Sequence, residues 1–286
     1  GFIYYNGSTL ASVSSDGGAG WTYMVGANAS FDASASGVAA WNGQTLTVIE
    51  RETGNTLYSG SMDAEILSAK AGALYTAALL APEHDSTVVL LENGGREIDR
   101  LTFADQTVLD YGFFSGDSLF WIMTLDTSGT VPTTAISTYR PGRMIVGSIT
   151  DSQQLMYQVM FQSSQVVCAG TTHLKVYDYT GREDESKRTL IYGWYLAAVE
   201  EGVDDPMMAF VPDAQYGTGS DMRDVRMIRS NADQIVRMPF SCIALVAKGD
   251  CVYGFSEDGH VMVARVGQQK VDAYLLEVPA AQVYGV

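Results

Sequence analysis

The sequence is poor in cysteine. Its three cysteines, Cys168, Cys242 and Cys251, form no CxxC pair, and each lies in an apolar run. We expect them to be buried small side chains, with a bridge between Cys242 and Cys251 as the lesser alternative. The odd number leaves at least one thiol free.

Basic residues are also scarce. The chain has 17 Lys and Arg against 33 Asp and Glu, a formal net charge of −16. Such a surface repels nucleic acids and anionic membranes, so neither is an expected partner. No run of about 18 apolar residues is present, which excludes a membrane-spanning helix. The chain starts at Gly1 without a methionine, which leaves open an earlier signal or anchor segment.

What the sequence does contain is a repeated phrase: an apolar strand, a polar turn and a second strand. Seven copies occur, at residues 2–13, 46–62, 87–103, 119–138, 174–190, 225–240 and 252–266. Their turns carry Gly or Asn, because hairpin turns need positive φ angles. Seven hairpins in 286 residues give one about every 40 residues, which is the spacing of propeller blades.

A further apolar strand precedes most of these hairpins, for example at 37–44, 73–85 and 166–173. Each unit then has an inner strand, a second strand, and a hairpin of third and fourth strands. We predict a single all-β domain over residues 1–286, a seven-bladed β-propeller, with six or eight blades left open. A tandem of two β-sandwiches is the alternative, although no Pro-rich or Gly/Ser-rich linker separates two halves.

The two ends of the chain look like parts of one blade. Residues 2–13 resemble third and fourth strands, and residues 270–278 and 281–286 resemble first and second strands. We predict that N- and C-terminal strands share this blade. Such pairing closes the ring, brings the termini together and removes two exposed sheet edges.

The turn phrases resemble the repeat of quinoprotein-type, PQQ-repeat-like propellers, Asp-x-x-Thr-Gly-x-x-x-Trp. The residues that fit it, with Glu and Tyr as replacements, are Glu50, Thr53, Gly54, Tyr58, Asp178, Thr180 and Gly181. The resemblance implies a bacterial type of propeller and the extracytoplasmic location common among such repeats. No position matches a quinone- or metal-binding residue, so it implies no cofactor.

Motifs for catalysis or metal binding are missing. The sequence has no GxSxG, HExxH, GxxxxGK[ST] or EF-hand pattern. We place His84 and His173 on turns between second and third strands and His260 on a turn between third and fourth strands, at the opposite end. This excludes one shared metal site or triad and favours solvated turn residues. The acidic segment 200–206 matches no calcium loop, and we predict no metal site there.

One segment breaks the rhythm of the repeat. Residues 212–224 stand where a turn between second and third strands is expected, yet they are longer than the other turns of this kind. Long loops on rigid scaffolds often bind ligands, and Tyr216, Asp221 and Arg223 are the contact residues we predict. A tolerated insertion without a role is the alternative.

Three further residues are candidates for binding. Arg140 and Arg143 stand out against the acidic background and are suited to receive an acidic group, or else pair with nearby Asp or Glu. Trp41 directly precedes the Asn42-Gly43 turn, where we expect it at the rim of the propeller, although structural packing is the usual role of such aromatics.

These observations favour a non-catalytic binding or scaffold module. Its partner would be another protein or a cell-envelope ligand, recognised by loops on the propeller faces. The alternative is a propeller-type hydrolase or lyase with acidic residues in the central funnel. Two or more carboxylates or histidines within hydrogen-bond reach of one another on inner strands would favour the enzyme.

Overall fold

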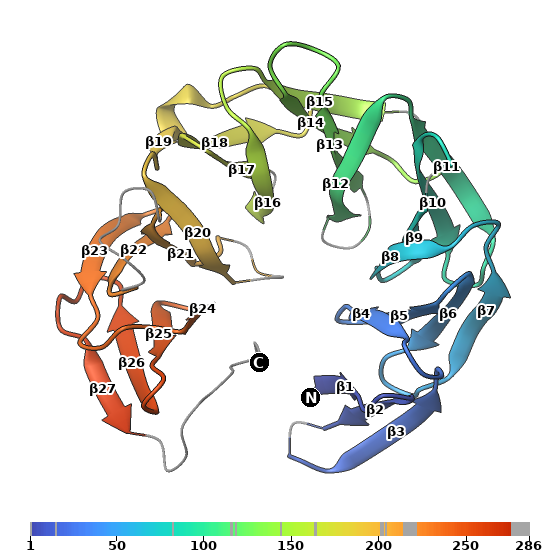
Figure 1. The fold of residues 1–286 in the computed structure, drawn as a ribbon, viewed down its shortest axis with the longest axis horizontal. Coiled ribbons are helices and arrows are strands. Elements are labelled where there is room, and N and C mark those ends of the chain that lie inside the picture. The colour runs from blue at the N-terminus through green and yellow to red at the C-terminus, as the bar shows by residue number, and fades with distance from the viewer. Residues whose placement is uncertain are drawn as a thin grey trace. The chain divides into compact units, whose positions relative to one another are not determined.

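The computed structural model describes residues 2–275 except 15, 82, 115, 116, 118, 144, 163, 164, 201, 202, 204 and 214–221. The chain forms two compact units, Gly1–Ser152 and Gln153–Val286, which we describe separately. Their named elements are β-strands and the short 3-10 helix η2 (Figure 1). No helix among the described residues is long and apolar enough to cross a membrane.

The unit Gly1–Ser152 contains four antiparallel sheets. The first has three strands, β1 (Phe2–Tyr5), β2 (Thr9–Val13) and β3 (Ala19–Met24). The second has β4 (Ser30–Ala33), β5 (Gly37–Asn42), β6 (Thr45–Glu50) and β7 (Thr56–Ser61). The third has β8 (Ile66–Ala71), β9 (Tyr75–Leu80), β10 (Ser86–Glu92) and β11 (Glu97–Phe103). The fourth has β12 (Gln106–Phe113), β13 (Phe120–Asp126), β14 (Thr133–Tyr139) and β15 (Ile145–Asp151).

The unit Gln153–Val286 contains three such sheets. The fifth sheet of the chain has β16 (Met156–Gln162), β17 (Gln165–Gly170), β18 (His173–Asp178) and β19 (Thr189–Leu190), with η2 (Glu185–Lys187) before β19. The sixth has β20 (Trp194–Val199), β21 (Met208–Pro212), β22 (Asp224–Arg229) and β23 (Ala232–Arg237). The seventh has β24 (Ala244–Lys248), β25 (Cys251–Phe255), β26 (His260–Arg265) and β27 (Asp272–Leu275).

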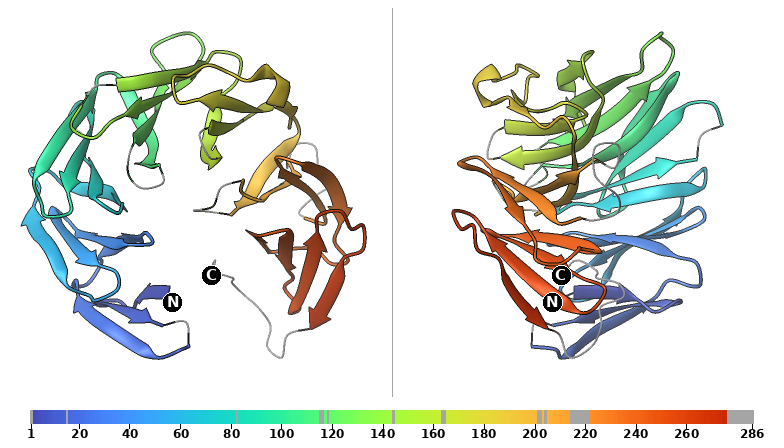
Figure 2. Two further views of the ribbon diagram at one scale, coloured as in Figure 1. Left: turned by 180° about the vertical axis from the view of Figure 1, so that it is seen from behind. Right: turned by 60° about the vertical axis from the view of Figure 1, so that its left-hand side comes forward.

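In every sheet the strands lie in chain order, each antiparallel to the one before it. Within each unit the first strand of every four-stranded sheet lies on the inner side and the fourth on the outer side (Figures 1 and 2). We call β4, β8, β12, β16, β20 and β24 the first strands. An up-and-down sheet repeated along the chain is the blade of a propeller, so the seven sheets confirm the predicted seven-bladed β-propeller.

Burial explains the apolar runs of the second and third strands. Val38 and Ala39 in β5 and Leu46 in β6 are fully buried. Leu46 belongs to one apolar cluster with Ala78 and Val89 of the next sheet. A strand covered on both faces has a continuous apolar run, whereas an outer strand such as β7 alternates between exposed and partly buried residues.

None of the three cysteines, all of which the structure describes, forms a disulfide. Cys168 in β17 and Cys242 before β24 are buried, and Cys251 at the start of β25 is partly buried. The preferred prediction, small side chains in apolar surroundings, is therefore confirmed for Cys168 and Cys242.

Neighbouring sheets are joined where an aromatic side chain covers a turn glycine. Trp21 in β3 lies over Gly54 in the β6–β7 turn, whose φ of +76° suits glycine. A Cβ at Gly54 would stand 2.5 Å from Trp21 Cγ. The Trp21 indole also donates a hydrogen bond of 2.7 Å to the Arg51 carbonyl. Tyr58 in β7 covers Gly95 of the following sheet in the same way, so residues of the quinoprotein-like phrase connect one blade to the next.

Two copies of the repeat are shifted by one strand from their predicted place. Residues 119–138 and 252–266 form second and third strands, β13–β14 and β25–β26, because β15 and β27 follow them on the outer side. The predicted hairpins of third and fourth strands are wrong there. Most residues of β15 are exposed or only partly buried, so this outer strand gave little apolar signal in the sequence, while β27 was predicted as a first strand instead of a fourth.

The predicted roles of the terminal segments change for the same reason. Strands β1 and β2 are followed by β3 in one sheet, so residues 2–13 are not the last two strands of a blade. Strand β27, from the segment predicted as a first strand, pairs with β26 as a fourth strand. Residues 276–286 lie outside the described residues, and so do both termini. The shared blade and the single domain over 1–286 therefore stay predictions.

The Trp21–Gly54 contact predicts a difference between two glycine substitutions in one sheet. Gly43 and Gly54 both have positive φ, but a Cβ at Gly43 would meet no atom within 4 Å. Gly43→Ala should cost about 1–2 kcal/mol for its left-handed backbone. Gly54→Ala should cost about 1–3 kcal/mol more, because its methyl group overlaps Trp21. Chemical denaturation of both variants measures this, and equal losses would show that the contact carries no packing energy.

Candidate functional site

Four consecutive first strands carry a β-bulge near their beginning. The register shifts lie between Ile66 and Ser68 in β8, Val108 and Asp110 in β12, Met156 and Gln158 in β16, and Leu196 and Ala198 in β20. The extra residue is Leu67, Leu109, Tyr157 or Ala197. A bulge leaves one residue unpaired and redirects its side chain, and bulges often lie beside functional sites.

In the unit Gly1–Ser152 the bulges expose two leucines at equivalent positions. Leu67 in β8 is 52% exposed and Leu109 in β12 is 45% exposed. Most other apolar residues of these two strands are buried or partly buried. The bulge therefore turns an apolar side chain away from the core in two neighbouring first strands.

Charged side chains stand on the same first strands. Lys70 in β8 has its Nζ 3.7 Å from Oδ1 of Asp32 in β4. The other carboxylate oxygen of Asp32 accepts a hydrogen bond of 2.8 Å from the Ala71 N–H. Asp110, which follows the bulge residue Leu109, accepts a hydrogen bond of 2.9 Å from the Tyr111 N–H. We call Asp32, Leu67, Lys70, Leu109 and Asp110 the inner-strand surface.

The Asp110 carboxylate is partly withdrawn from water. Burial raises its pKa, the hydrogen bond from the Tyr111 N–H and the charge of Lys70 lower it, and the charge of Asp32 raises it. The net effect is upward, so the ionised form is less favourable here than in the unfolded chain.

A buried tyrosine fixes β12 against the preceding sheet. The Tyr111 hydroxyl lies 2.8 Å from the Ser68 hydroxyl and accepts a hydrogen bond of 3.2 Å from the Leu79 N–H. Burial raises the pKa of Tyr111, so the phenol stays neutral. Because Ser68 and Tyr111 flank the two bulges, this link holds Leu67 and Asp110 at a fixed spacing.

The inner strands carry two carboxylates. Asp32 and Asp110 are the only Asp, Glu or His on β1 and the first strands, and no hydrogen bond between them is found in the described structure. No group of three His, Cys, Asp or Glu among the described residues could hold a metal ion. The arrangement that would favour an enzyme, with acids in hydrogen-bond contact on inner strands, is not seen in this part of the chain.

In the unit Gln153–Val286 a bulge residue is aromatic. Tyr157, the bulge residue of β16, stacks on Tyr195 of β20 with ring centroids 5.6 Å apart and planes 10° apart. Tyr195 is 56% exposed. The Tyr157 hydroxyl accepts a hydrogen bond of 3.3 Å from the Leu196 N–H, which orients the pair.

Trp41, a predicted binding residue, lies in β5 of the second sheet. It is the last residue but one of β5 and is partly buried against the apolar cluster that contains Ile66 of β8. The Ile66 N–H donates a hydrogen bond of 2.9 Å to the Gly43 carbonyl in the adjoining turn. Trp41 therefore shares an apolar cluster with Ile66, which immediately precedes the bulge residue Leu67, and its role in binding stays a prediction.

Arg140 and Arg143 lie in the β14–β15 turn, at the other end of the sheets from the bulges. The Arg143 N–H donates to the Arg140 carbonyl at 2.9 Å, with Pro141 and Gly142 between them, as in a type II turn. The Gly142 N–H donates to Asp99 Oδ2 at 2.7 Å, which fixes the turn. Both arginines are exposed, and no ion pair to either is found among the described residues.

The structure describes only part of the long segment 212–224. Tyr216 and Asp221 lie outside the described residues, while Arg223 is partly buried in the turn before β22. Its carbonyl accepts a hydrogen bond of 2.7 Å from the Met238 N–H. Binding by these three residues stays a prediction.

The predicted position of His260 is wrong. His260 opens β26, a third strand, and so lies on a turn between second and third strands, as His84 and His173 do. The error follows from the one-strand shift of the seventh sheet. His260 stacks on Phe240 with centroids 4.0 Å apart, and its Nδ1 is 2.9 Å from Asp258 Oδ1.

The acidic segment 200–206 makes ion pairs and backbone contacts. Asp205 accepts hydrogen bonds from the N–H and hydroxyl of Ser230 and lies 3.4 Å from Arg229 Nη2. Glu200 accepts the Gly249 N–H at 2.9 Å. These described carboxylates tie neighbouring turns together.

Solved structures share the fold of this chain. BamB from Moraxella catarrhalis is 12% identical with a TM-score of 0.60, over 97% of this chain and 86% of that one. Sqt1 from Saccharomyces cerevisiae is 10% identical with a TM-score of 0.60, over 94% and 80%. A europium-containing methanol dehydrogenase is 11% identical with a TM-score of 0.56, over 97% and 78%.

No protein-family model matches the sequence, and no curated protein sequence matches it either. At identities of 10–12% the structural likeness establishes the fold alone, and that fold is a β-propeller.

The environment of Asp110 predicts a pH-dependent gain in stability on its replacement. Its pKa is raised above 3.8 in the folded chain, so the carboxyl contributes stability below pH 3.8 that is lost as the pH rises through its folded-state pKa. Asp110→Asn should therefore unfold at higher denaturant than the wild type at pH 7, and the gap should narrow toward pH 4.

Glu92→Gln is the control for this substitution. The hydrogen bond from Arg96 lowers the pKa of the exposed Glu92 carboxyl, so its removal should give no gain at pH 7. A gain in both variants, or in neither, would contradict the account of Asp110.

Proposed function

We propose that this chain is a non-catalytic binding module that recognises another protein through the inner-strand surface. The observation that supports this most is the repeated bulge, which exposes Leu67 and Leu109 at equivalent positions of neighbouring strands. A bulge interrupts strand pairing. Exposure of a leucine side chain to water is energetically unfavourable. Both features favour a surface that is covered by a partner.

The chemistry of the surface supports binding rather than catalysis. Apolar side chains at the centre of an interface supply burial energy, while charged groups around them set orientation and specificity. Asp32 and Lys70 already form an ion pair, and each Asp carboxylate accepts a backbone N–H. This leaves little freedom for the proton transfer that a hydrolase or lyase needs.

A second contact is proposed at the β14–β15 turn. Arg140 and Arg143 are exposed on a backbone fixed by Asp99, and two guanidinium groups on a rigid turn suit a carboxylate or another acidic group. This end of the sheets would contact a different part of a partner from the inner-strand surface.

We also propose an extracytoplasmic location, with a protein or ligand of the cell envelope as the partner. The quinoprotein-like phrase of the turns supports this location, because repeats of this type are common there. The charge of −16 supports a protein partner over nucleic acid.

Capture from a cell-envelope extract tests the function. The immobilised wild-type chain should retain a partner that the Leu67→Asp/Leu109→Asp double variant loses, because two buried charges would oppose docking. Leu57→Asp is the control, since Leu57 is 43% exposed on the outer strand β7. Equal thermal unfolding of the variants excludes loss of fold, and equal capture by the double variant and the wild type would contradict the proposal.

A further inference from the structure

Asp110 makes no ion pair in the described structure, although the charge of Lys70 lowers its pKa. Lys70 is the only Lys or Arg on β1, β4, β8 and β12, and its ammonium group lies 3.7 Å from Asp32. The described residues place no ion pair on Asp110, whose Oδ1 accepts only the neutral Tyr111 N–H. A half-buried carboxylate of this kind is better stabilised when a cation reaches it.

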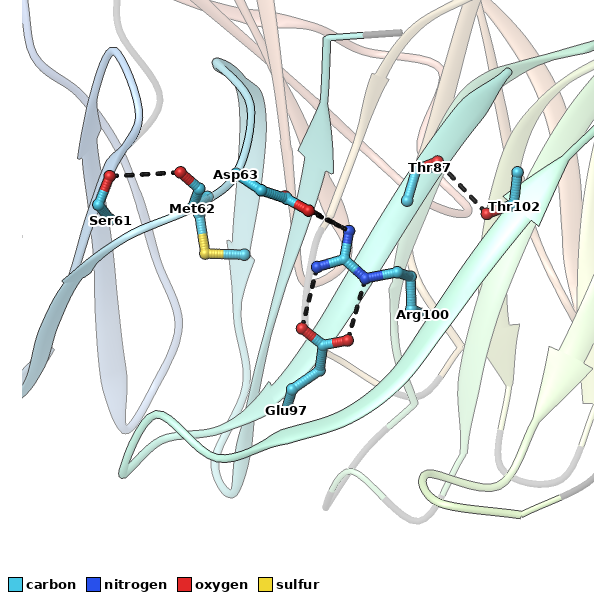
Figure 3. A network of polar contacts seen from close by, with 7 residues as sticks. All are labelled: Ser61, Met62, Asp63, Thr87, Glu97, Arg100 and Thr102. Atoms are coloured by element: carbon cyan, nitrogen blue, oxygen red, sulfur yellow. Dashed lines mark hydrogen bonds and ion pairs between the residues drawn. The ribbon is translucent and has the colours of Figure 1, made fainter. Parts of the chain in front are cut away.

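Other carboxylates of the same unit have arginine partners. Glu97 and Asp63 both pair with Arg100 on the outer side of the third sheet, where the guanidinium lies between the two acids (Figure 3). Glu92 pairs with Arg96 in the β10–β11 turn. Asp110 differs from these three in having burial without a paired cation.

The residues around Asp110 indicate which kind of ligand would supply such a cation. Leu109 precedes it in the chain, and Leu67 occupies the equivalent bulge on β8, the first strand of the preceding sheet. A simple amine or inorganic cation would leave both leucines exposed. A polypeptide segment that carries Lys or Arg beside apolar side chains would cover the leucines and neutralise the carboxylate together.

We propose that the inner-strand surface binds a basic, apolar segment of its partner protein, with a Lys or Arg on Asp110 and apolar side chains on Leu67 and Leu109. This inference rests on the proposed function and adds the chemistry of the partner. The net charge of −16 would attract such a segment from a distance and repel an acidic one.

Two labelled peptides test the pairing. One nine-residue probe alternates leucine with lysine, and its twin has glutamate at every lysine position; fluorescence anisotropy measures the binding of both. The lysine peptide should bind more tightly than its twin. Asp110→Asn should lower the affinity for the lysine peptide about tenfold, because a charge-assisted hydrogen bond is lost. Leu67→Ala/Leu109→Ala should weaken it as well.

Glu92→Gln is the matched control, because it removes one negative charge at the opposite end of the third sheet. It should change the affinity by less than about twofold, since exposed distant charges are screened by salt. Equal losses in Asp110→Asn and Glu92→Gln would show a general attraction to the acidic chain and overturn the inference.

The remaining outcomes separate this inference from the proposed function. The lysine peptide could fail to bind, or bind equally well to Asp110→Asn, while capture of the envelope partner still depends on Leu67 and Leu109. The inference of a basic segment would then be wrong, and the proposed binding surface would remain supported. If capture is also independent of the leucines, both proposals fail.

Discussion

Within each of the two units, the blades depend on contact with their neighbours. A four-stranded sheet of this chain has two apolar faces, and neither can be left in water without cost. The next sheet covers one face, as when Leu46 meets Ala78 and Val89, and Trp21 over Gly54 fixes the approach of two sheets at a turn. The side chains of the second and third strands are buried in this packing. Binding residues can therefore stand on the first strands and the turns.

The first strands also pack against their neighbours, except at the bulge residue. Their bulges release a single residue from the sheet while the strands on either side stay paired, which exposes Leu67 and Leu109 without opening the core. Tyr111, bonded to Ser68 and the Leu79 amide, keeps the two bulged strands at a fixed separation. A rigid scaffold with prearranged contact residues loses little entropy on binding.

The sequence was sufficient for the architecture and insufficient for the site. Turn glycines and buried strands repeat at a regular spacing, so seven blades could be predicted, whereas the outer strand β15 was missed and β27 was assigned as a first strand. A bulge has no sequence signature of its own. In the sequence Leu67 and Leu109 look like ordinary strand leucines, and only the strand register shows that they have no partner residue. The influence of Lys70 on Asp110 likewise depends on which strands become neighbours, and local sequence does not encode that.

Site-specific photocross-linking tests the central claim most directly. A benzophenone amino acid replaces Leu67, Leu109 or, as a reference on an outer strand, Leu57, and each protein is irradiated in a cell-envelope extract. The account predicts one and the same cross-linked partner from positions 67 and 109 and none from position 57. Adducts that are absent at 67 and 109, or identical at all three positions, would contradict it.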